Sequence, residues 1–188
     1  MGGIEMTVSF TGHRPSKMCG YDAAAYMDFV QRLARFLAEL CPGEPLKVIT
    51  GGAQGVDQLA FWAADLAKNL RGGITNAVYV PFRGQQSIWK ETGLFSRQQY
   101  ETMLQAADEM YYLAEKPETK SGVVKALHAR NHRMVEASDQ VVAVYLGQDW
   151  HTESGGTAEC MRYAESKGKP LRVVHCHIQD GKLAANFA

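Results

Sequence analysis

Short runs of consecutive apolar residues alternate along the chain with longer stretches in which apolar residues recur every three or four positions. The short runs predict strands, and the longer stretches predict amphipathic helices. Strands are predicted at residues 7–10, 47–50, 77–80, 110–113, 140–146 and 171–175. Helices are predicted from a cap at Asp22 to residue 40 and over residues 56–67, 96–107, 123–138 and 156–167, with Gly168 ending the last of them.

Strands that alternate with helices of this length are typical of βαβ units, which build a mostly parallel sheet. The runs around Val48, Val78 and Val141 are apolar throughout, as a sheet covered by helices on both faces requires. Residues 82–95 show no clear period and are expected to form a long loop. The pattern therefore predicts an α/β fold, a single Rossmann-like domain over residues 1–188 with its core at residues 7–175.

Composition narrows the expected partners. The 188 residues include 20 Lys and Arg and 20 Asp and Glu, so the formal net charge is zero. Proteins that bind nucleic acid normally carry a basic excess, so nucleic acid is not the expected partner. No stretch approaches the about 20 apolar residues that cross a bilayer, and the N-terminus lacks a signal-peptide pattern. With four cysteines and no CxxC pair, we expect a cytoplasmic protein with reduced thiols and no membrane partner.

Glycine-rich and charged residues follow the predicted strands. Open parallel sheets bind ligands beyond the carboxyl ends of their strands, where helix N-termini direct free N–H groups. Two separate glycine turns, after the strands at 47–50 and 140–146, would each let backbone amides approach a phosphate. The candidate ligand-binding residues at these ends are Gly12, His13, Arg14, Gly51, Gly52, Gly55, Asp57, Gln85, Trp89, Gly155, Gly156 and Thr157.

Several of these residues also have a purely structural explanation. A Gly-Gly pair after a strand is often only a tight turn, and neither segment matches GxGxxG or a Walker A motif. Asp57 either complements the dipole of its helix or accepts a ribose hydroxyl. Trp89 either packs in its loop or stacks on a base. His175 and His177 flank Cys176 on a strand, where alternation puts the cysteine on the opposite face, so no metal site is expected.

In their order along the chain, these motifs resemble the YpsA-like family of the SLOG superfamily, which is related to the Lonely guy phosphoribohydrolases and to DprA. The matching segments are GHRP at 12–15, ITGGAQGVD at 49–57, PF at 81–82 with Gln85 and Trp89, RN at 130–131, SD at 138–139 and GGT at 155–157. The resemblance implies a pocket for a nucleotide derivative such as ADP-ribose or NAD, with no other cofactor required. It places the ligand on both glycine turns and adds Arg130 and Asn131 to the site.

One position departs from the phosphoribohydrolase pattern. Those relatives carry GGxGTxxE, whose glutamate activates cleavage of the N-glycosidic bond. Aligning Gly156 and Thr157 with that GT places Cys160 at the glutamate position. Glu159 is its neighbour, about 100° away around the helix. If this chain cleaves N-glycosidic bonds, Glu159 and Arg130 are the expected catalytic residues.

Three functions therefore stay open. The first is a nucleotide-binding sensor or regulatory domain that signals to a protein partner, as the two glycine turns and the missing glutamate suggest. The second is a nucleoside-phosphate N-glycosidase. The third is a DprA-like binder of single-stranded DNA, using basic and aromatic side chains. The resemblance also allows a homodimer, since SLOG relatives commonly dimerise through surface helices.

Overall fold

The computed structural model describes residues 5–89 and 93–187. Within them, one sheet has the strand order β4-β3-β2-β1-β5-β6-β7. All neighbouring strands run parallel except β7, which pairs antiparallel with β6. The mostly parallel sheet predicted from the sequence is therefore confirmed. The strands are β1 (Met6–Gly12), β2 (Leu46–Thr50), β3 (Ile74–Val80), β4 (Glu109–Tyr112), β5 (Gln140–Tyr145), β6 (Leu171–Gln179) and β7 (Lys182–Ala185).

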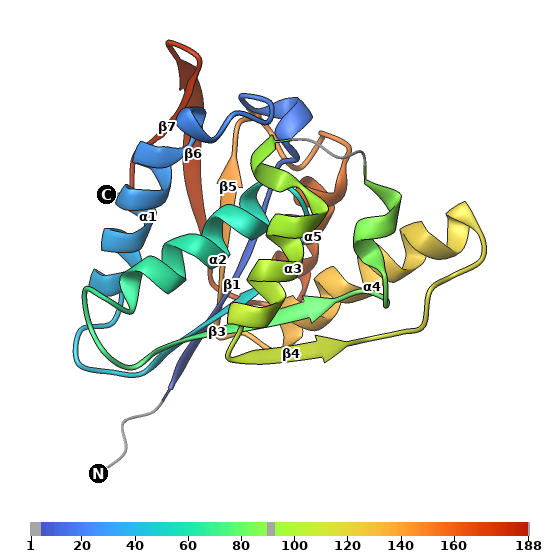
Figure 1. Ribbon diagram of the computed structural model, residues 1–188, viewed down its shortest axis with the longest axis horizontal. Coiled ribbons are helices and arrows are strands. Elements are labelled where there is room, and N and C mark those ends of the chain that lie inside the picture. The colour runs from blue at the N-terminus through green and yellow to red at the C-terminus, as the bar shows by residue number, and fades with distance from the viewer. Residues whose placement is uncertain (1–4, 90–92, 188) are drawn as a thin grey trace.

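Helices cover both faces of the sheet (Figure 1). Val8 and Phe10 of β1 pack with the first two helices, whereas Val141 of β5 packs with Cys160 and Ala164 on the opposite face. None of the helices in the described ranges is long and apolar enough to cross a membrane. The helices are α1 (Met27–Glu39), α2 (Val56–Ala67) and α3 (Arg97–Ala106) on one face and α4 (Lys120–Glu136) and α5 (Gly156–Ser166) on the other, with 3-10 turns at Pro15–Lys17, Ala23–Ala25, Gln85–Ile88 and Gly93–Phe95.

The order of the strands changes direction at β1. The chain runs outward from β1 through β2 and β3 to β4, and then returns to the other side of β1 as β5. The helices that follow β1 and β5 lie on opposite faces of the sheet. Such a switch point leaves a crevice beyond the carboxyl ends of the two strands, which is where open α/β sheets bind ligands.

The predicted start of the first long helix is wrong. Asp22 caps a 3-10 turn instead, because its Oδ1 accepts a hydrogen bond from the Ala24 amide at 3.0 Å. Tyr26 then interrupts the helical path with a φ of −121°, and its hydroxyl donates to the Gly20 carbonyl at 2.7 Å. α1 begins only at Met27. The helix predicted over 96–107 is confirmed as α3, and Ser96 caps it, since its Oγ accepts from the Gln99 amide at 3.2 Å.

The last predicted strand, 171–175, is too short. β6 continues to Gln179, and a two-residue Asp180-Gly181 turn with φ values of 51° and 71° leads into β7. An Asp-Gly pair is a strong hairpin signal, and the prediction overlooked it. On β6, Cys176 is buried and both flanking histidines are exposed, as alternation predicts. Among the described residues, no group of three or more His, Cys, Asp or Glu side chains is placed to hold a metal ion.

Candidate functional site

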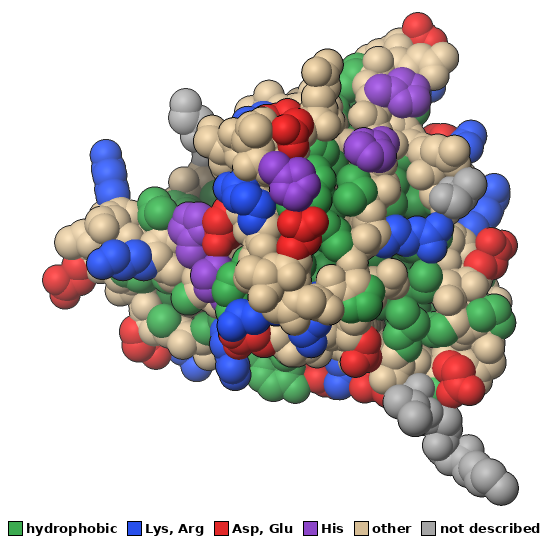
Figure 2. Space-filling model, turned by 180° about the vertical axis from the view of Figure 1, so that it is seen from behind, with side chains coloured by type: hydrophobic (Ala, Val, Ile, Leu, Met, Phe, Trp, Pro, Cys, Tyr) green, Lys and Arg blue, Asp and Glu red, His purple; other side chains and the backbone are tan. Residues whose placement is uncertain are grey.

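A cleft of about 340 Å³ opens beyond the carboxyl ends of β1 and β5. The face seen from behind, on the side of α4 and α5, gathers histidine, basic and acidic side chains, with hydrophobic side chains beside them (Figure 2). The cleft is lined by Thr11, Gly12, His13, Arg14 and Lys17 after β1, Ala53, Gln54 and Asp57 before and within α2, Val124, Leu127, His128, Arg130 and Asn131 of α4, and Tyr145, Glu153, Ser154, Gly155, Gly156, Thr157 and Ala158 at β5 and α5.

The segment after β1 packs directly against the start of α2. A Cβ on Gly12 would lie 2.4 Å from the Val56 side chain, so only glycine fits there. Gly55 has a φ of +102°, and a Cβ on it would lie 2.3 Å from the His13 carbonyl oxygen. That oxygen accepts a hydrogen bond from the Val56 amide at 3.3 Å. The N-terminus of α2 is therefore closed by the chain itself, and Gly55 does not line the cleft.

A buried ion pair forms the floor of the cleft. Arg130 of α4 is 4% exposed, and its Nη1 lies 2.7 Å from Oδ2 of Asp57 in the first turn of α2. The same carboxylate oxygen accepts from the Ala53 amide at 3.3 Å. Burial lowers the pKa of the neighbouring Arg14, and the charge of Asp57 opposes that shift. Asp57 thus interacts both with the N-terminal region of α2 and with the buried Arg130.

The glycine turn after β2 is filled by Arg130. A Cβ on Gly51 would lie 0.9 Å from Arg130 Nη1, so the guanidinium occupies the space of the missing side chain. Gly52 has a φ of +66° and packs against the Tyr100 ring, with 3.0 Å between that ring and a Cβ added to Gly52. Neither glycine is among the residues that line the cleft.

Gln85 and Trp89 also lie away from the cleft lining. Gln85 is buried, and its Nε2 donates to the Gly51 carbonyl at 3.5 Å. Trp89 is 8% exposed and packs edge-on against Tyr100, with 4.9 Å between ring centroids. Of the two explanations for Trp89, the structure therefore shows loop packing.

The glycine turn after β5 faces the cleft. Gly155 has a φ of +123° and precedes Gly156, the first residue of α5. A Cβ on Gly156 would meet nothing closer than Asn131 Nδ2 at 4.0 Å, and one on Gly155 nothing closer than Lys17 Nζ at 3.8 Å. The first amides of a helix have no acceptor within the helix. This turn therefore presents backbone donors next to a lysine and an amide side chain.

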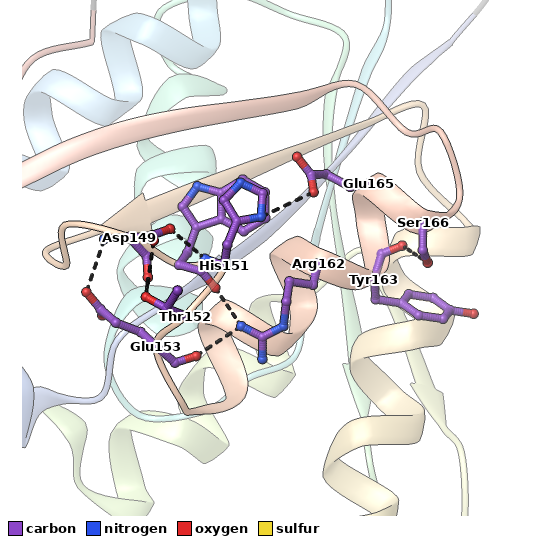
Figure 3. A network of polar contacts seen from close by, with 9 residues as sticks. Asp149, His151, Thr152, Glu153, Arg162, Tyr163, Glu165 and Ser166 are labelled. Atoms are coloured by element: carbon purple, nitrogen blue, oxygen red, sulfur yellow. Dashed lines mark hydrogen bonds and ion pairs between the residues drawn. The ribbon is translucent and has the colours of Figure 1, made fainter.

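Polar contacts hold the loop before this turn against α5 (Figure 3). Arg162 Nη1 donates to the carbonyls of Trp150 and Glu153 at 2.5 and 2.9 Å. The Asp149 carboxylate accepts from the His151 amide at 3.0 Å. Glu153 Oε1 in turn accepts from the Asp149 amide at 3.2 Å. The loop is therefore tied to the helix whose N-terminus it precedes, which orients Gly155 and Gly156.

The charges of the cleft are unequally compensated. The Tyr145 hydroxyl donates a hydrogen bond to Glu153 Oε2 at 2.5 Å. Burial, reinforced by this bond, raises the pKa of Tyr145 to about 12. The same bond lowers the pKa of Glu153. His13 stacks on Tyr145, and burial together with the charge of Lys17 lowers the pKa of His13. Within the described residues, neither Arg14 nor Lys17 forms an ion pair. The cleft therefore holds basic groups without acidic partners.

Several cleft residues were not singled out from the sequence. Lys17 and Glu153 are ordinary charged residues in predicted loops, and Tyr145 ends an apolar strand. Lys17 and Glu153 each stand within five residues of a glycine motif, and that proximity is the signal that would have found them. Tyr145 lies ten residues before Gly155 and carries no such signal. Val124 and Leu127 line the cleft, but in the sequence they look like any other apolar residues of a helix, so no pattern distinguishes them.

Glu159 and Cys160 both lie outside the cleft lining. Glu159 Oε1 is 2.6 Å from His132 Nε2, and its Oε2 is 3.1 Å from His128 Nδ1, so both carboxylate oxygens meet histidines of α4. His132 in turn stacks on the Tyr163 ring, with 3.6 Å between centroids. Cys160 is 2% exposed in the core, and burial raises its pKa to about 12.

Fold and cleft together define a Rossmann-like α/β protein with a glycine-rich helix N-terminus at the switch point of its sheet. The X-ray structure of TM1055 is similar, with a TM-score of 0.49 and 18% identity, over 88% of this chain and 72% of that chain. The uncharacterized SPbeta prophage-derived protein YoqJ of Bacillus subtilis (strain 168) is 32% identical over 126 residues, which span 63% of this chain and 69% of that protein. The YpsA model, described as the YspA SLOG family, matches residues 8–178. The chain belongs to this YpsA family of SLOG proteins, as the motifs predicted.

Proposed function

We propose that this protein binds a phosphate-bearing nucleotide derivative in the cleft and acts through that binding, as a sensor or regulatory domain. The observation that carries the proposal is the open N-terminus of α5, with Lys17 Nζ 3.8 Å from the position of a Cβ on Gly155. The positive end of a helix dipole and an ammonium group repel each other. A bound anion removes this repulsion, as phosphates at helix N-termini do.

The rest of the cleft suits the remainder of a nucleotide. Val124 and Leu127 provide apolar surface, and Asp57, Arg130 and Asn131 provide donors and acceptors for sugar hydroxyls or base edges. Small-molecule sites combine apolar walls with a few fixed polar groups in this way. A chain that is neutral overall but has a basic cleft favours a small anion over a long nucleic acid.

Binding is proposed ahead of cleavage because of the position of Glu159. A carboxylate that stabilises a ribosyl centre needs an oxygen directed at the ligand. Both oxygens of Glu159 instead contact His128 and His132, and the residue does not line the cleft. In the proposed role, a protein partner distinguishes the nucleotide-bound protein from the nucleotide-free protein.

Proton NMR with a panel of AMP, ADP-ribose, NAD and a cyclic dinucleotide tests the proposal. Saturation transfer to at least one nucleotide, with its base and anomeric signals unchanged, is the expected result. Transfer should weaken in Lys17→Gln and persist in Lys182→Gln, a control on the exposed β7 strand. Free-base signals that vanish in Glu159→Ala would establish a glycosidase instead. No saturable binding by any nucleotide would contradict the proposal and direct the search to single-stranded DNA.

A further inference from the structure

We infer that the cleft takes up a proton from solvent when it binds an anionic nucleotide, and that His128 holds this proton. Glu159 does not line the cleft and acts only by positioning the His128 imidazole. This inference rests on the proposed function and adds a regulation to it, since nucleotide affinity then depends on pH. It concerns the contact between α4 and α5, and the glycine turns play no part in it.

His128 lies between the cleft and a carboxylate. Its side chain is 41% exposed and lines the cleft, and its Nδ1 is 3.1 Å from Glu159 Oε2. The other ring nitrogen, Nε2, forms no hydrogen bond with the described residues. A protonated imidazole donates hydrogen bonds from both nitrogens. His128 in this form therefore has one donor for Glu159 and a second for a ligand anion.

The carboxylate of Glu159 is held in place from its other side. Its Oε1 is 2.6 Å from His132 Nε2, and the His132 ring stacks on Tyr163 with 3.6 Å between the ring centroids. Its Oε2 is buried and has no aligned hydrogen bond within the described part of the chain. Such bonds are often misaligned in ligand-free proteins and tighten in the complex. A charged His128 satisfies this oxygen better than a neutral one, because charge-assisted hydrogen bonds are stronger.

The charges of the cleft make the protonation of His128 depend on the ligand. Within the described residues, neither Arg14 nor Lys17 forms an ion pair, so both oppose a further positive charge in the ligand-free protein. A bound anion offsets these charges. Histidine gains and loses its proton near neutral pH, where this coupling therefore acts. The titratable and charged groups that share the cleft with His128 are His13, Arg14, Lys17, Asp57, Arg130, Tyr145 and Glu153.

His13 is the other histidine of the cleft, and it is less suited to hold the proton. Burial and the charge of Lys17 lower the pKa of His13, and the charge of Glu153 opposes this shift only in part. The His13 ring stacks on Tyr145, and no carboxylate contacts it among the described residues. Protonation therefore costs more at His13 than at His128, whose ring meets Glu159.

Isothermal titration calorimetry counts the protons that are taken up on binding. The full chain is titrated with ADP-ribose, NAD and a cyclic dinucleotide near neutral pH, in PIPES and in imidazole buffers, which differ in ionisation enthalpy. These ligands keep a constant charge there, whereas the monoester phosphate of AMP has a second pKa of about 6. We expect binding enthalpies that differ between the buffers in the sense of proton uptake. The affinity should fall by about three- to tenfold from about pH 6 to about pH 8.

Two variants separate this role of Glu159 from a structural one. His128→Gln should abolish the proton uptake, and Glu159→Gln should reduce it by about half or more, because the amide keeps the shape of the carboxylate and loses its charge. His177→Gln, at an exposed position of β6, is the matched control and should leave uptake and affinity unchanged. A carboxylate that only braces α4 against α5 would change stability in Glu159→Gln and leave the proton count as it is.

The failures of the two proposals are distinguishable. Binding without proton uptake would overturn this inference and leave the proposed function intact. Uptake that persists in His128→Gln would assign the proton to another group, such as His13, and would overturn the inference as well. So would failure of all three ligands to bind, and the proposed function would then fall only if AMP also failed to bind.

Discussion

The two glycine turns lie at the same edge of the same sheet, and they differ in what fills them. The turn after β2 is occupied by Arg130, by Tyr100 and by the segment after β1. Among the described residues, the side chains nearest to a Cβ built on Gly155 or Gly156 of the turn after β5 are Lys17 and Asn131, both at about van der Waals distance or beyond. A glycine pair after a strand therefore does not by itself indicate a ligand site. The decisive feature is whether the protein's own side chains occupy the space.

The charge at each helix start explains the difference. Asp57 lies in the first turn of α2, where it offsets the positive end of the helix and pairs with Arg130. Glu159 lies in the first turn of α5, but its carboxylate is held by His128 and His132. The N-terminus of α2 is therefore offset by Asp57, whereas the carboxylate in the first turn of α5 contacts two histidines instead.

The largest expected effect comes from breaking the ion pair at the filled turn. Asp57→Ala leaves the buried Arg130 without its partner, so the free energy of unfolding should fall by about 3–5 kcal/mol. Urea denaturation measures it. Adding Arg130→Met to Asp57→Ala should recover part of the loss, because no buried charge then lacks a partner. A double variant less stable than Asp57→Ala would contradict this account of the filled turn.

Matched alanine substitutions at the two turns compare them directly. Gly51→Ala puts a methyl group into the Arg130 guanidinium and should cost about 1–3 kcal/mol of stability. Gly156→Ala has room for its Cβ and should change stability by less than about 0.5 kcal/mol. Denaturation curves of both variants provide the measurement. Equal losses at the two positions would show that the turns do not differ as described.

Removing the lysine at the open turn should stabilise the ligand-free protein. Lys17→Gln relieves repulsion with the α5 N-terminus and should raise the free energy of unfolding by about 0.3–1 kcal/mol at low salt. The gain should shrink as salt screens the charges. Lys182→Gln serves as the control. A loss of stability in Lys17→Gln would mean that the lysine has a stabilising contact in the free protein.

The smallest expected effect is a pH dependence from His13. Burial lowers its folded-state pKa below the ordinary value of 6.5, so the unfolded chain binds the proton more readily. This contribution to stability is present above pH 6.5 and is lost as the pH falls from there to the folded-state pKa. Melting curves across this range should show a shallower dependence in His13→Gln than in His177→Gln, an exposed control. Identical dependence in both variants would contradict the assignment to His13.

The fold was largely predictable, because continuous apolar runs and helical periods are local signals. The site was predictable only in part. Strand ends placed Gly12, Asp57 and Gly156 at one edge of the sheet, and family motifs added Arg130 and Asn131. That Arg130 fills the space above Gly51 depends on a contact between residues 79 positions apart. No local pattern encodes such a contact, so Gly51 and Gly156 looked equivalent until the structure separated them.

The most direct test is an amide ¹H–¹⁵N NMR titration of the wild-type protein with AMP. The account predicts saturable shifts of the Gly155, Gly156 and Thr157 amides, with Gly51 and Gly52 moving much less. Shifts centred on Gly51 and Gly52, or no saturable shift anywhere in the spectrum, would contradict it.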